Sequence, residues 1–117
     1  MTYQPGSHLI ASLQTEDVMK IAEYTAFKNW LHDRIHDYNL TKLGEVWHNF
    51  SPGGFTGVVC LSESHLSIHT WPEHLLINLD IYLSNYERRN DNTVNALFQE
   101  ISHFFNGQTV QVQTIVR

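Results

Sequence analysis

The chain contains several short stretches in which hydrophobic and polar residues alternate, and a period of two is typical of β-strands. In residues 65–71, leucine and isoleucine fall on one face while histidine and serine fall on the other, and Pro72 then ends the pairing. Residues 75–83 repeat the pattern, with an apolar residue at every second position. Further strands are predicted at residues 8–13, 43–50, 55–62 and 109–116. The proline and glycines of residues 51–54 predict the turn of a hairpin.

Two other stretches repeat their hydrophobic positions at the spacing of an α-helix. The first is predicted as one long helix that Thr15 caps and that ends near Asn39, with residues 25–30 as the less regular section where a break would fall. The second covers residues 94–105 and is stopped by an Asn-Gly pair. The aromatic residues expected in the core are Phe27, Trp30, Phe98 and Phe104.

Two helices among five or six strands, without a regular strand-helix alternation, indicate an α+β fold. We expect a two-layer sandwich of a mostly antiparallel sheet with both helices on one face, formed by residues 1–117 as a single domain. The other face of the sheet then lacks a helical cover. Such a face is solvated, binds a ligand or pairs with a second sheet.

The composition excludes several classes of function. A hydrophobic content of 42% in 117 residues suffices for one core, and a formal net charge of −5 offers no basic surface to nucleic acid. No apolar run approaches a membrane span, and the N-terminus lacks the features of a signal peptide. The lone cysteine, Cys60, cannot form an internal disulfide and is expected to be a small buried hydrophobe. A cytoplasmic protein without nucleic-acid or membrane partners is therefore predicted.

Eight histidines make a metal site worth considering. His65 and His69 are four residues apart, a spacing that chelates a metal ion on a helix but holds the two rings too far apart on a strand. No metal is therefore predicted.

The most specific feature of the sequence is residues 63–73, ESHLSIHTWPE, because amphipathic packing alone would not generate it. This stretch resembles the self-cleaving site of the prokaryotic, pyruvoyl-dependent S-adenosylmethionine decarboxylase proenzymes. Residues 6–11 (GSHLIA) are similar to the opening strand of that family, and residues 48–59 (HNFSPGGFTGVV) to the hairpin before its cleavage site. The similarity weakens after Ser84. The resemblance implies an S-adenosylmethionine decarboxylase-like domain that pairs as a homodimer.

The resemblance also implies self-cleavage between Glu63 and Ser64. In the family, the serine oxygen attacks the preceding carbonyl, the peptide becomes an ester, and β-elimination cuts the chain and leaves a pyruvoyl group in place of the serine. His69 occupies the position of the base that assists elimination, and Thr56 that of a hydroxyl in the same proton relay. All the processing residues are present.

The expected substrate is S-adenosylmethionine, a precursor for spermidine, whose amine would condense with the pyruvoyl carbonyl before decarboxylation. Glu73 matches a carboxylate that hydrogen-bonds the ribose, and Glu63 is expected to lie along the substrate. The family's catalytic thiol, which protonates the product, falls on Ser84, whose hydroxyl is far less acidic than a thiol of pKa about 8.5. Counting along an extended strand places Cys60 roughly 13 Å from Ser64, too far to replace that thiol.

Three functions remain open at this point. The chain is a decarboxylase of S-adenosylmethionine that tolerates serine as the proton donor. Alternatively, it is a relative that decarboxylates another amino acid, such as arginine or ornithine. In the third reading it makes no product, and serves as a binding module or as the regulatory partner of an active paralogue.

Overall fold

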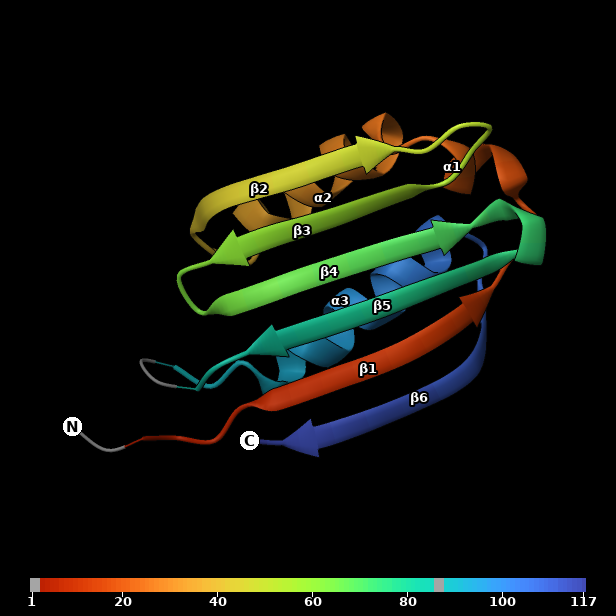
Figure 1. Cartoon of the computed structure of the whole chain (residues 1–117). Coiled ribbons are helices and arrows are strands. Elements are labelled where there is room, and N and C mark those ends of the chain that lie inside the picture. Colours follow the sequence, from red (N-terminus) through yellow and green to blue (C-terminus); the bar gives the residue numbers. More distant parts are fainter. Residues whose placement is uncertain (1–2, 86–87) are drawn as a thin grey trace.

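The structure is a computed structural model that describes residues 3–85 and 88–117. It contains a six-stranded antiparallel sheet whose helices lie on one face (Figure 1), so the predicted α+β two-layer fold is confirmed. The strands are β1 (Ser7–Gln14), β2 (Lys42–Asn49), β3 (Phe55–Leu61), β4 (Ser64–Trp71), β5 (Leu76–Leu83) and β6 (Gln108–Val116). The helices are α1 (Val18–Ala22), α2 (Thr25–Asp37) and α3 (Asp91–Phe104), and a 3-10 turn, η1 (Pro72–His74), joins β4 to β5.

The strands follow the order β2-β3-β4-β5-β1-β6, so β2 to β5 form consecutive hairpins while β1 lies between β5 and β6. The predicted alternation is confirmed on β4, where Leu66 and Ile68 are buried, and on β5 from Ile77 to Leu83. Leu75 was expected at the start of β5. It instead has a left-handed backbone, with φ of 53°, at the end of η1, and β5 begins one residue later.

The long helix predicted near the N-terminus is two helices. Glu23 is extended between α1 and α2, and its carboxylate accepts hydrogen bonds from the backbone N–H and the hydroxyl of Thr25. The predicted capping role of Thr15 is wrong, because Asp17 is the N-cap residue of α1. The Thr15 hydroxyl accepts a hydrogen bond from the Asp17 N–H and donates one to the carbonyl of Phe105 at 2.6 Å. Thr15 therefore ties the end of β1 to the end of α3.

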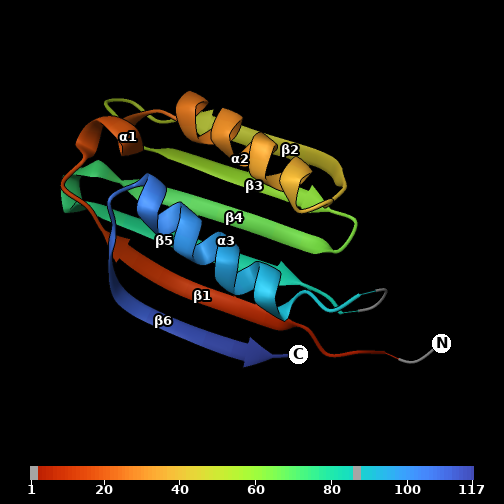
Figure 2. The same cartoon turned by 180° about the vertical axis from the view of Figure 1, so that it is seen from behind.

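The core lies between the sheet and the helices, which stand behind the strands in Figure 1 and in front of them in Figure 2. Phe27 of α2 is fully buried at the centre of this core. The centroid of the Phe27 ring lies 5.0–6.2 Å from the centroids of the neighbouring aromatic rings. These neighbours are Trp30, Trp47, Phe55, Phe104 and Phe105. The core positions predicted for Phe27 and Phe98 are confirmed, whereas Trp30 and Phe104 are only partly buried against the core.

No helix of the described residues covers the opposite face of the sheet, which we call the open face. One row across it contains Val46, Val58, Ser67, Asp80 and Ile10, paired from β2 to β1. The three aliphatic side chains of this row are exposed. Within residues 3–85 and 88–117, no helix is long and apolar enough to cross a membrane.

We expect a stability difference between two glycines on neighbouring strands. Trp47 of β2 pairs with Gly57 of β3, and a Cβ at Gly57 would lie 2.4 Å from two carbons of the Trp47 ring. Gly44 of β2 has nothing within 4 Å of such an atom. Gly57→Ala should therefore lower the free energy of unfolding by about 1–3 kcal/mol, and Gly44→Ala by less than about 0.5 kcal/mol. Urea denaturation in a Ser64→Ala background, which keeps the chain intact, measures both; equal losses would refute this packing account.

Candidate functional site

Ser64 is the first residue of β4, at the turn that follows β3. Its φ is 137°, a backbone conformation that residues with side chains rarely adopt. Strain of this kind costs on the order of 1–3 kcal/mol, clusters at functional sites and persists only where the surroundings impose it. The serine singled out by the sequence is therefore the one at which the backbone is strained.

The carbonyl that precedes Ser64 is polarised by a backbone donor. Ser64 lies opposite Leu83 in the β4–β5 register, and the N–H of the next residue, Ser84, donates a hydrogen bond of 2.7 Å to the Glu63 carbonyl oxygen. A donor aimed at this oxygen stabilises the negative charge that develops there when a nucleophile attacks the carbonyl carbon. Three of the predicted site residues are thus brought together, and we call Glu63, Ser64 and Ser84 the cleavage group.

The side chain of Glu63 is held within the chain. Arg88 donates to both of its carboxylate oxygens at 3.0 Å, and the Asn90 amide donates to one of them at 2.5 Å. Burial alone would raise the pKa of the Glu63 carboxyl, but the hydrogen bonds from Arg88 and Asn90 lower it below the ordinary value. The carboxylate therefore stays ionised at neutral pH.

Thr56, His69 and Glu73 form a separate set, which we call the pocket group. The Thr56 hydroxyl and the His69 Nδ1 are joined by a hydrogen bond of 2.6 Å across the β3–β4 pair. All three residues line a cavity of about 620 Å³. The other residues that line it are Phe50, Ser51, Pro52, Gly53, Phe55, Thr70 and Trp71.

The two groups do not meet within one chain. His69 follows Ser64 by five residues on the same regular strand, and at about 3.3 Å per residue the two lie roughly 16 Å apart. A proton cannot pass directly over that distance. The base predicted for Ser64 is therefore out of its reach in the monomer.

A histidine cluster that the sequence did not reveal lies beside Ser64. His8, His65 and Tyr82 occupy adjacent positions on β1, β4 and β5, with ring centroids 5.2–5.9 Å apart, and Asp80 lies 3.7 Å from His8. The His65 Nδ1 is 3.4 Å from the Ser64 hydroxyl oxygen. Burial, and then the nearby His8, lowers the pKa of His65, so its neutral form can accept a proton near neutral pH. The alternation of β1 and β4 was readable in the sequence, but the pairing of β1 with β5 was not.

The position predicted for Cys60 is wrong on two counts. Its side chain is exposed rather than buried. The distance counted along the strand also fails, because the chain reverses after β3 and Cys60 comes to lie opposite His65, with Leu61 opposite Ser64. The thiol is therefore on the neighbouring strand, next to the cleavage group.

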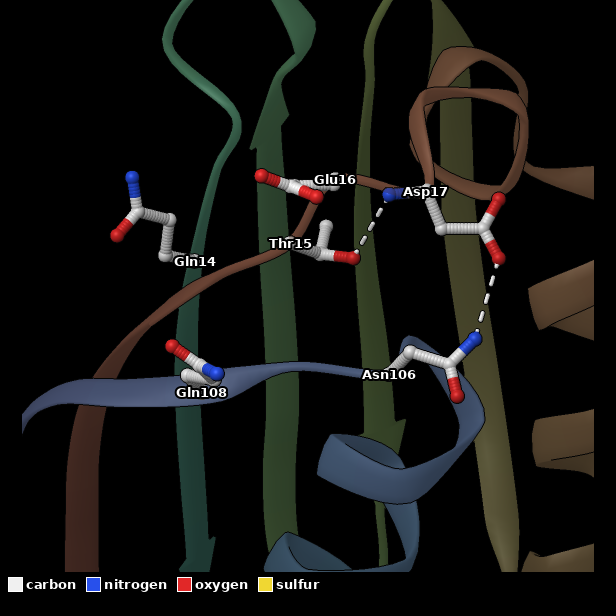
Figure 3. A pocket seen from close by; sticks show the side chains of 6 residues that line it. All are labelled: Gln14, Thr15, Glu16, Asp17, Asn106 and Gln108. Atoms are coloured by element: carbon white, nitrogen blue, oxygen red, sulfur yellow. Dashed lines mark hydrogen bonds between the residues drawn. The ribbon is translucent and has the colours of Figure 1, made fainter.

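A polar cavity of about 490 Å³ lies at the other end of the sheet (Figure 3). Its lining residues are Gln14, Thr15, Glu16, Asp17, Asn106 and Gln108. Some of its polar groups bond one another, as in the 3.3 Å hydrogen bond from the Asn106 amide to Asp17. Gln14 pairs with Leu76, at the opposite end of β5 from Leu83 and Ser64, so this cavity is remote from the cleavage group. Within the described residues, no three histidine, cysteine or acidic side chains are grouped to hold a metal ion.

Fold and site define the structural class: a small α+β sandwich in which a serine sits at a strained backbone position directly after a polarised carbonyl. The chain belongs to the S-adenosylmethionine decarboxylase family, whose family model matches residues 7–117. The resemblance seen in the sequence is thereby confirmed.

Individual relatives agree with this assignment. The S-adenosylmethionine decarboxylase proenzymes of Archaeoglobus fulgidus and Aquifex aeolicus are 43% and 44% identical over 77 residues, which is 66% of this chain in each case. Those segments make up 69% and 57% of the two relatives. A crystal structure of the adenosylmethionine decarboxylase from Aquifex aeolicus matches 99% of this chain and 91% of that one, with a TM-score of 0.78 at 31% identity.

Proposed function

We propose that this protein is a proenzyme that cleaves itself between Glu63 and Ser64 and then decarboxylates S-adenosylmethionine in polyamine biosynthesis. The observation that carries the proposal is the geometry at this bond. The strained Ser64 directly follows a carbonyl that accepts a 2.7 Å hydrogen bond from the Ser84 N–H. The family match over residues 7–117 supports the same reading.

The cleavage chemistry balances with the groups present. The Ser64 oxygen attacks the Glu63 carbonyl carbon, the new C–O bond replaces the C–N bond, and the freed nitrogen takes up a proton. Removal of the Ser64 α-proton then expels the Glu63 carboxylate by β-elimination. Water converts the remaining dehydroalanine to a pyruvoyl group and releases ammonia. His65 is placed to accept the hydroxyl proton, and His69 is the base proposed for the elimination.

The residues around Ser64 fit a pyruvoyl cofactor, because the polarised carbonyl and the strained serine are what its formation requires. Once formed, the group supplies an electron sink for the loss of carboxylate. Ser84 stands where the family has its thiol, so protonation of the product depends on a hydroxyl, a bound water or the thiol of Cys60. We propose no metal in the reaction.

The cavity of the pocket group suits a nucleoside. Phe50 and Trp71 on its wall are 51% and 44% exposed, so aromatic faces are open to a flat base. Glu73 on the same wall is proposed to accept hydrogen bonds from the ribose hydroxyls, and the chain's net charge of −5 favours a cationic sulfonium substrate. The proposed contact of Glu63 with the substrate is less direct, because Arg88 and Asn90 bind its carboxylate.

We further propose a homodimer that completes the site. Two copies stacked with their open faces together, about a two-fold axis that lies between the faces and crosses β4 midway between Ser64 and His69, would each bring a pocket group to the partner's cleavage group. The roughly 16 Å that separates these residues in one chain is then spanned by the partner's His69. The exposed aliphatic row on this face supports such a contact.

The other readings of the sequence are not favoured. Both relatives compared above are named S-adenosylmethionine decarboxylase proenzymes, and neither name points to arginine, ornithine or a regulatory paralogue. The cytoplasmic location stays a prediction.

Self-cleavage is tested by the intact mass of freshly purified protein under denaturing conditions. We expect two fragments that break between Glu63 and Ser64, with a carbonyl reagent adding only to the C-terminal one. Ser64→Ala is the control and should stay uncut. A stable single species near 13.6 kDa in the wild type would rule out the proposed function.

The shared site predicts complementation between two inactive chains. His69→Gln and Ser64→Ala should each remain uncut alone, but in the co-expressed mixture the His69→Gln chain should be cut, because its Ser64→Ala partner supplies His69. Gel electrophoresis of differently tagged chains follows the cut. The matched control pairs His69→Gln with a chain that carries both substitutions. Mixed dimers that form but stay uncut would contradict a site shared between subunits.

Ser84→Cys should raise the decarboxylation turnover on the order of tenfold or more, because it restores an acid of suitable pKa. Cleavage should be unchanged, since Ser84 bonds Glu63 through its backbone. Carbon dioxide release per cleaved chain measures the gain, with Cys60→Ser as the companion variant that tests the neighbouring thiol. Full cleavage without any gain in turnover would argue against this role of the side chain.

A further inference from the structure

Arg88 connects parts of the chain that are distant in the sequence. Its guanidinium donates through Nε and Nη2 to the two carboxylate oxygens of Glu63, each at 3.0 Å. The same Nη2 donates to the carbonyls of Tyr38 and Asn39 at 3.1 and 3.0 Å. Those carbonyls lie just beyond the end of α2, where the helix leaves carbonyl groups unpaired and a cation is favourable. The fixed fork of a guanidinium thus holds Glu63 against the end of a helix.

Asn90 binds both residues that meet at the polarised carbonyl, Glu63 and Ser84. Its amide donates to the Glu63 carboxylate at 2.5 Å and to the Ser84 carbonyl at 2.8 Å. Asn90 is 1% exposed, and its own N–H donates to Asn85 at 2.6 Å, so it has little freedom to move. Glu63, which precedes the serine, and Ser84, whose N–H polarises the Glu63 carbonyl, are therefore both bound by the Asn90 side chain.

From these contacts we infer that Arg88, assisted by Asn90, is a positioning residue for self-cleavage. The two side chains hold Glu63 so that its carbonyl stays on the Ser84 N–H and the strained φ of Ser64 is maintained. Arg88 touches no reacting atom and acts only through Glu63. This inference rests on the proposed self-cleavage and adds to it the device that holds the bond in place.

The ion pair between Arg88 and Glu63 is independent of pH near neutrality. The pKa of Glu63 is lowered and that of Arg88 is raised by their mutual hydrogen bonds, so both remain charged. Because the Glu63 pKa is depressed, the pair persists above the ordinary glutamate pKa and is lost only as the pH falls through the lowered value. Any change of cleavage rate between pH 6 and 8 must then come from other groups.

The neighbouring arginine offers a matched control. The Arg89 side chain is 72% exposed and pairs with Asp91, two residues away, without contacting Glu63. Because exposed ion pairs contribute little to stability, Arg89→Gln should leave the fold intact. The melting temperature of the Arg88 variant, measured beside it, separates a loss of stability from a loss of positioning. Slower cleavage in the Arg88 variant, without slower cleavage in the Arg89 variant, would then report on positioning.

The test is the rate at which fragments appear at pH 7 in wild type, Arg88→Gln, Arg88→Lys and Arg89→Gln, together with their melting temperatures. We expect Arg88→Gln to slow cleavage on the order of tenfold to a hundredfold, since a shift of about 1 Å in a reacting group has that effect. Arg89→Gln should cleave as the wild type does. Arg88→Lys, which keeps the charge without the fork, should be intermediate, and a low, non-denaturing concentration of guanidinium should accelerate Arg88→Gln but not Arg89→Gln.

The failures of the two proposals are distinguishable. A wild type that cleaves while Arg88→Gln keeps pace would overturn the positioning role alone. Equal slowing in both arginine variants, with equally lowered melting temperatures and no rescue by guanidinium, would also overturn it, because the effect would then be one of general stability. An uncut wild type would overturn it together with the proposed function.

Discussion

The antiparallel pairing of β4 with β5 is the constraint on which the rest of the site depends. It sets Ser64 opposite Leu83, and the next amide along, that of Ser84, then falls on the Glu63 carbonyl. The same regular strand carries His69 five residues away from Ser64. The β4–β5 register therefore polarises the Glu63 carbonyl, while the length of β4 keeps that carbonyl apart from the pocket group. A slip of one residue would turn every side chain of β4 to the opposite face.

The strain at Ser64 is sustained by contacts from several parts of the chain. The end of α2 is connected to Glu63 through Arg88, and the start of α3 through Asn90. Gly6, before β1, approaches the backbone of Leu83 and Ser84 so closely that a Cβ there would lie 2.4 Å from the Leu83 carbonyl oxygen. An unusual backbone angle persists only when the surrounding residues hold it in place. Around Ser64 these residues come from distant parts of the sequence, from Gly6 near the N-terminus to Arg88 and Asn90.

The sequence predicted the strands well because alternation is a local property, and the family resemblance supplied Ser64, His69 and Thr56. Contacts that depend on the order of the strands in the sheet could not be predicted from the sequence. His8 and Tyr82 are 74 residues apart in the chain, yet their ring centroids lie 5.2 Å apart, because β1 is inserted beside β5. The misjudged position of Cys60 has the same origin, since counting along one strand ignores the reversal of a hairpin. Arg88 lies in a polar loop whose periodicity carries no signal, so only the fold could connect it with Glu63.

The strand order has a consequence for the protein after a cut between Glu63 and Ser64. The first fragment would supply β1, β2 and β3 and the second β4, β5 and β6, yet in the sheet β1 of the first lies between β5 and β6 of the second. The two pieces would be interlaced rather than stacked side by side, and separating them would require pulling a strand out of the middle of the sheet. Folding must then come before cutting. Once denatured, the mature protein would have to reassemble as a bimolecular reaction between two pieces, neither of which holds a contiguous half of the sheet.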